Sequence, residues 1–221
     1  METRTLYRPV GLLELELILD SEARAFPPRL PEQPIFYPVL NSEYATQIAS
    51  TWNPFDSRSG FSGFVTEFEV DSEYLHGFET KVVGASRHQE LWVPAERLSE
   101  FNSRLCSKIR VTSAFYGAEY QGPKPLPTIL RSAQPGEQLK VLRNTFSYSG
   151  FDFVLEIAAN WKVVVCNFGL WSAMSPEQQG LTSEEASKTL VAIKKAWEPR
   201  HPDLPLPSGS LVNVPKPVGV E

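Results

Sequence analysis

Three short segments in the first part of the chain carry side chains suited to nucleotide chemistry. Tyr7 and Arg8 end the first apolar stretch, and Tyr37 ends a second one before a proline. His88 and Glu90 stand at the start of a third. An arginine binds phosphate or paired hydroxyls through its planar fork, a tyrosine ring stacks on a flat group, and a carboxylate stabilises positive charge. We therefore expect a nucleotide to bind between the end of the first strand and the start of the Glu90 strand.

The order of these segments resembles the ADP-ribosyltransferase superfamily. That superfamily places a basic residue at the end of the first strand, an aromatic residue before a helix, and a glutamate at the opening of a later strand. The segments Leu6–Gly11, Ile35–Pro38 and His88–Pro94 follow this order. The resemblance covers roughly residues 3–118 and is closest to a group of bacterial proteins associated with ADP-ribosylation. It implies a split β-sheet fold and an enzyme that uses NAD as a substrate and transfers ADP-ribose to an unknown macromolecular acceptor.

The resemblance also implies a role for each residue. Cleavage of the nicotinamide–ribose bond builds positive charge on the ribose, as in glycoside hydrolysis. Glu90 would be the carboxylate that stabilises this charge. Arg8 would hold the adenosine ribose or the pyrophosphate, with Tyr7 beside it, and Tyr37 would stack on the nicotinamide. The activity implied is that of an ADP-ribosyltransferase or an NAD glycohydrolase.

His88 departs from the superfamily pattern. The position two residues before the catalytic glutamate often holds Glu or Gln, which selects the acceptor, and here it holds His88. Arginine-modifying chemistry is therefore unsupported, and the acceptor stays open. His88 could instead act as a general base, since histidine exchanges a proton near neutral pH.

The elements that must position these residues can be predicted from periodicity and proline punctuation. Alternating apolar residues predict strands at Thr5–Arg8, Gly63–Val70, Val82–Gly84, Glu90–Val93 and Lys108–Tyr116. Helices are expected over residues 11–20, 42–52 and 95–101, the second of them capped by Asn41 and buried along Tyr44, Ile48 and Trp52.

The second part of the chain follows a proline- and glycine-rich stretch at residues 117–127. A helix is expected over Glu137–Phe146, and alternation from Phe151 to Ile157, followed by a turn at Ala159-Asn160, predicts a β-hairpin. Thr182 and Glu185 form a capping box that opens a helix ending at Trp197. The fold class expected is α+β, with an ADP-ribosyltransferase-like split-sheet domain over 1–118 and an accessory α+β unit over 128–221 that ends in a proline-rich tail.

Composition excludes several classes of protein. The chain has 221 residues and a net charge of −5, which argues against a general nucleic-acid-binding surface. The apolar runs are too short for a membrane span, and three scattered histidines and two cysteines offer no metal-ligand spacing. Cys106 and Cys166 lie on apolar segments and are expected to be buried and inert. A cytoplasmic, metal-independent protein is the default expectation.

Two alternatives to an enzyme stay open. The same fold could have lost catalysis and serve as a binding module that engages a protein or a nucleotide. The convergence of Arg8, Tyr37 and Glu90 on one cleft would distinguish the enzyme from the binding module. A nucleic-acid-modifying protein is disfavoured by the acidic balance, although a local basic strip could form at Arg87, Arg104, Lys108 and Arg110.

Overall fold

The protein is built on two β-sheets and a group of helices, and its computed structural model describes residues 2–84 and 88–212. The larger sheet has the strand order β1-β3-β6-β7, with bounds Thr3–Val10, Ser62–Asp71, Arg110–Tyr116 and Ser208–Leu211 respectively. The smaller sheet has the order β2-β5-β4, with bounds Ile35–Phe36, Gln89–Pro94 and Glu79–Val82. Neighbouring strands are antiparallel except for the parallel pair β6–β7.

One residue, Val39, joins the two sheets. Its backbone forms antiparallel bridges with Tyr7 of β1 on one side and Glu90 of β5 on the other. Val39 follows the proline-rich residues 27–38 and lies between strands that are distant in the sequence. The backbone of β5 is therefore held at a fixed register against β1.

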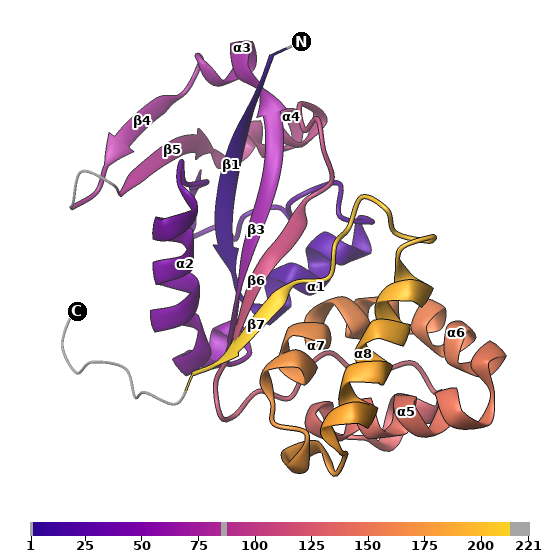
Figure 1. Ribbon diagram of the computed structural model, residues 1–221. Coiled ribbons are helices and arrows are strands. Elements are labelled where there is room, and N and C mark those ends of the chain that lie inside the picture. The colour runs from indigo at the N-terminus through magenta and orange to yellow at the C-terminus, as the bar shows by residue number, and fades with distance from the viewer. Residues whose placement is uncertain (1, 85–87, 213–221) are drawn as a thin grey trace.

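Helix α2 (Ser42–Thr51) covers one face of the larger sheet, and α1 (Leu12–Asp20) lies on the other (Figure 1). The Asn41 side chain accepts a hydrogen bond of 2.8 Å from the Tyr44 backbone N–H, which confirms the predicted cap. The predicted buried stripe was one residue off, because Ala45 and Ala49 are the buried residues of α2. A β-carbon at Gly63 would collide with the Ala49 carbonyl, so small residues allow this helix to approach β3 closely.

Most of the predicted strands and helices of residues 3–118 are confirmed with shifted ends, but the strand predicted at Val82–Gly84 is wrong beyond Val82, because β4 runs from Glu79 to Val82. The helix expected at 95–101 is a turn of 3₁₀-helix followed by α4 (Leu98–Ser103), and a single further helical turn, α3 (Ser72–Leu75), follows β3. The apolar faces of α1, α4 and the sheet form the main core, which includes Leu15, Phe36, Phe64 and Phe68.

The predicted β-hairpin is wrong, because both of its arms are helices. The helices of this part are α5 (Gln138–Tyr148), α6 (Gly150–Ala159), α7 (Trp161–Ala173) and α8 (Ser183–Trp197). Ser149 caps α6 by accepting from the Asp152 backbone N–H at 3.2 Å. Phe153, Glu156 and Ile157 are its buried residues, at helical spacing. The capping box of Thr182 and Glu185 at the start of α8 is confirmed.

The two parts of the chain share one core. After α8 the chain returns along β6 as β7 and completes the larger sheet (Figure 1). The Tyr116 hydroxyl of β6 donates to the Cys166 backbone carbonyl of α7 at 2.8 Å. The fold class is therefore α+β, and the accessory part consists of helices and a strand that belongs to the first sheet. The division into units at 1–118 and 128–221 stays a prediction; residues 1 and 213–221 lie outside the described residues.

The two cysteines differ in exposure. Cys166 is fully buried on α7, and this burial raises the pKa of its thiol. Cys106 is exposed, in the loop before β6. The expectation that both are buried is therefore wrong for Cys106.

Candidate functional site

Glu90 lies on the face of the sheet that carries α2, and its carboxylate is held by two donors. The Tyr44 hydroxyl donates to Oε1 at 3.0 Å and the Trp92 indole N–H donates to Oε2 at 3.2 Å. Trp92 comes from the same strand as Glu90, and Tyr44 comes from the first turn of α2. The carboxylate is thus fixed in orientation by one contact within β5 and one from the helix.

His88 lies in the same cluster. Its ring stacks on Tyr44 with a centroid separation of 4.3 Å and an interplanar angle of 13°. The Nδ1 atom lies 3.1 Å from the Val83 carbonyl, which fits Nδ1 as the donor and leaves Nε2 as the acceptor in the neutral ring. Across residues 2–84 and 88–212 nothing hydrogen-bonds to the solvent-shielded Nε2 atom.

Tyr37 reaches the cluster through Trp92. The two rings meet edge to face at 5.3 Å, and the Lys81 ammonium lies 3.6 Å from the centre of the Trp92 ring. Lys81 is directly opposite Glu90 in the β4–β5 register, so both side chains are on one face. We name this cluster the Glu90 surface, which comprises Tyr37, Tyr44, Lys81, His88, Glu90 and Trp92.

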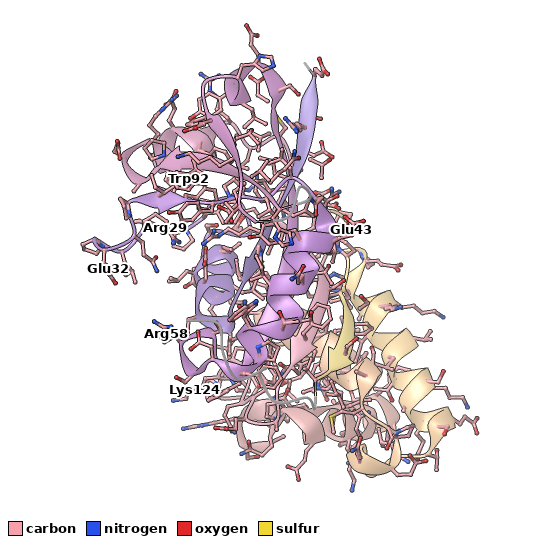
Figure 2. The ribbon with its side chains drawn as sticks, turned by 90° about the vertical axis from the view of Figure 1, so that its left-hand side faces the viewer. Arg29, Glu32, Glu43, Arg58, Trp92 and Lys124 are labelled. Atoms are coloured by element: carbon pink, nitrogen blue, oxygen red, sulfur yellow. The ribbon has the colours of Figure 1, made fainter. Side chains whose placement is uncertain are left out.

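Figure 2 views the molecule from the side of α2 and labels Trp92 of the Glu90 surface. Glu43 marks the end of α2 that lies toward the smaller sheet, and Trp92 lies on that sheet. The members of the cluster are half-buried, which leaves part of each side chain open to solvent. The environment of Tyr44 raises its pKa to about 12, because burial and the hydrogen bond to the negatively charged Glu90 both disfavour the phenolate.

Arg8 does not belong to this surface. Its Nε and terminal nitrogen donate to the two carboxylate oxygens of Glu14 at 2.8 and 3.1 Å, and its other terminal nitrogen donates to the Tyr37 carbonyl at 3.2 Å. The guanidinium also lies 4.7 Å from the centre of the Phe36 ring. Arg8 is only 8% exposed and contacts α1, so it lies on the opposite face from Glu90.

Tyr7 lies on the α2 face but is separate from Glu90, because Val39 stands between them. Its ring packs beside Ala45 and Val39. Burial, with the nearby Glu67 and Glu43 charges, raises the pKa of its hydroxyl. The structure therefore brings Tyr37, His88 and Glu90 together and leaves Arg8 and Tyr7 outside the cluster.

Sequence reasoning missed Tyr44, Lys81 and Trp92 as members of the site. Trp92 could have been found, because it follows Glu90 by two residues on a predicted strand, and residues two apart on a strand lie on the same face. Lys81 could be identified only from the register of the β4–β5 pair, which places it opposite Glu90. Tyr44 was interpreted as a core residue of its helix, and only the packing of α2 against β5 reveals its contact.

No protein family, curated protein or solved structure matches this chain. Within the described residues, no group of three or more His, Cys, Asp or Glu side chains is arranged to hold a metal ion. None of the described helices is by itself long and apolar enough to cross a membrane; α6 and α7 meet that criterion only as a pair, and they are bent by 102° at their junction.

Proposed function

We propose that this chain is a nucleotide-binding protein whose Glu90 surface binds NAD or a ribose-containing fragment of it. The observation that carries the proposal is the Glu90 carboxylate, fixed by Tyr44 and Trp92 at 3.0 and 3.2 Å. A carboxylate has about four acceptor positions, so two remain for a ligand. The adjacent hydroxyls of a ribose would fill them as a pair of charge-assisted hydrogen bonds.

The surroundings of Glu90 suit the other parts of such a ligand. The rings of Tyr37 and Tyr44 are half-buried and offer flat apolar surface to a base or a nicotinamide ring. The His88 ring stacks on Tyr44 beside the carboxylate and would form part of the wall of the site. Lys81 is the cation of the cluster; it lies 3.4 Å from the exposed Glu79 carboxylate and would face the pyrophosphate, in place of Arg8.

Binding is the more conservative proposal, because the arrangement that the ADP-ribosyltransferase resemblance implies is incomplete here: Arg8 is committed to Glu14 on the other face. Cleavage of NAD with transfer of ADP-ribose to a macromolecular acceptor, or to water, is the second candidate. The closeness of His88 to the Glu90 cluster favours it, because a base beside a charge-stabilising carboxylate is what such a reaction requires.

Calorimetry with NAD and ADP-ribose tests the proposal. Glu90→Gln removes the charged acceptor while keeping its size, and we expect it to weaken NAD binding by about tenfold or more, as for the loss of hydrogen bonds to a charged group. Glu32→Gln is the matched control, because Glu32 is exposed and is not a member of the Glu90 surface. It should bind NAD like the wild type. Absence of heat with the folded wild type at millimolar NAD would contradict the proposal.

The same variant separates the two candidates. A carboxylate that acts only in the transition state lowers turnover when it is lost and leaves affinity almost unchanged. Release of nicotinamide by the wild type, abolished in Glu90→Gln with NAD affinity intact, would establish the enzyme. Weakened affinity without nicotinamide release in either protein would establish the binding protein.

A further inference from the structure

A second hollow, separate from the Glu90 surface, lies beside the first half of β6. Its volume is about 670 Å³, and it is lined by residues of β3, β6, the loop after α1, the loop before β6 and the segment between α8 and β7. We name it the Lys108 cavity. In Figure 1 the segment that follows α8 runs beside β6 before it becomes β7, and residues 202–205 of that segment form one wall.

The lining of this cavity carries charges of both signs. Arg24, Lys108 and Arg110 line it together with the acids Glu67 and Asp203. Arg110 and Glu67 neutralise one another, because the Glu67 Oε1 atom accepts from Arg110 at 2.8 Å, and Arg110 also lies 3.7 Å from Glu69. Lys108 is half-buried, and within the described chain neither it nor Arg24 forms an ion pair.

Two further observations describe the polar groups here. The Nε atom of Arg110 is shielded from solvent and has no hydrogen-bond partner among the described residues. His201 lies at the start of the wall segment, and its pKa is lowered by burial and then by the charges of Lys108 and Arg200. An anion in the cavity would supply the opposite charge that Lys108 and Arg24 lack within the described chain.

We propose that the Lys108 cavity binds the phosphate group of a small phosphorylated molecule. Arginine forks and a lysine ammonium are the groups that proteins use for phosphate, and the two cations without an ion pair, Lys108 and Arg24, match a doubly charged phosphate better than a single carboxylate. The walls come from five separate segments of the chain, which suits a small molecule. The local basic strip considered from the sequence thus has two of its members, Lys108 and Arg110, in this cavity, while Arg87 lies outside the described residues.

Binding of inorganic pyrophosphate, measured by calorimetry at low ionic strength, tests this assignment. Lys108→Gln and Arg24→Gln remove charge without leaving an acid unpaired, so folding should be unaffected, which circular dichroism checks. We expect each to weaken pyrophosphate binding by about tenfold. Arg58→Gln is the matched control: the Arg58 side chain is 92% exposed, lies outside the cavity and is labelled in Figure 2, and its loss should leave binding unchanged.

Three outcomes would overturn the proposal. They are no binding by the folded wild type at millimolar pyrophosphate, equal weakening by Arg58→Gln, and binding of citrate as tightly as pyrophosphate, which would mean that the cavity does not prefer phosphate. Glu90→Gln should bind pyrophosphate like the wild type. Failure at this cavity is therefore distinguishable from failure of NAD binding at the Glu90 surface.

Discussion

Arg8 acts as a tie between three segments of the chain. Its side chain is fixed by the Glu14 carboxylate of α1 and the Tyr37 carbonyl, and it lies over the Phe36 ring. Strand alternation makes this placement understandable, because Arg8 and Tyr7 are adjacent on β1 and must point to opposite faces. The prediction that Tyr7 and Arg8 bind the same nucleotide conflicts with that alternation. The sequence shows which residue types are present, but the face on which each side chain lies follows only when the segment is treated as a strand with two faces.

Loss of Arg8 should therefore affect folding. In Arg8→Gln the ion-pair partner that remains for the Glu14 carboxylate among the described residues is Arg29, whose Nη1 atom is 3.9 Å away. We therefore expect the free energy of unfolding to fall by about 2–4 kcal/mol. Chemical denaturation measures it. Arg4→Gln, on the same strand but exposed, should change stability by less than about 0.5 kcal/mol. An Arg8→Gln protein of normal stability that no longer binds NAD would restore the phosphate role implied by the resemblance.

At the scale of the elements, α6 and α7 show where periodicity alone misleads. Apolar residues at 151, 153, 155 and 157 alternate like a strand, yet Phe153 and Ile157 also lie one helical turn apart. Phe151 and Leu155 are exposed, so half of the alternating set has no core to face. In α7 every residue from Val163 to Trp171 is buried, and such a run has no periodicity that separates a helix from a strand. Where caps and one-sided stripes existed, as in α2 and α8, the sequence predicted the helix correctly.

The contact between α7 and β7 depends on two glycines. A β-carbon at Gly209 would collide with the Gly169 carbonyl, so the strand and the helix meet backbone to backbone. Gly209→Ala should force them apart and lower the free energy of unfolding by about 1–3 kcal/mol, as overpacking does. Gly150→Ala is the control, since nothing lies within 4 Å of its added carbon. Thermal unfolding of both variants checks this, and equal melting temperatures would contradict the close contact.

At the scale of the whole molecule, one row of side chains crosses the face that carries α2. Strand register aligns its members, which are Arg110, Glu67, Tyr7, Val39, Glu90 and Lys81. Directly opposed residues share a face, so the row connects the Lys108 cavity at one end with the Glu90 surface at the other. The sequence offered Glu90 and the basic residues separately. Their alignment depends on Val39 pairing with both sheets, a long-range arrangement that no local pattern encodes.

The shared core predicts how the chain unfolds. The buried cluster that includes Phe64 and Phe68 of β3 continues into Val164, Phe168 and Trp171 of α7. Because separating the parts would expose this apolar surface, we expect a single cooperative transition, with equal midpoints by circular dichroism and tryptophan fluorescence. Two resolved transitions would instead support independent units at 1–118 and 128–221.

The two cysteines differ in exposure, so their rates of chemical modification report on different parts of the structure. Cys106 is open to solvent, whereas Cys166 is sealed beneath the contact of α7 with Tyr116 and Tyr120. A thiol reagent should modify Cys106 rapidly and Cys166 only when α7 separates from the sheet. The rate of the slow phase of modification would then measure how often this separation occurs. The two native cysteines therefore allow the separation of α7 from the sheet to be followed without introducing a cysteine by mutation.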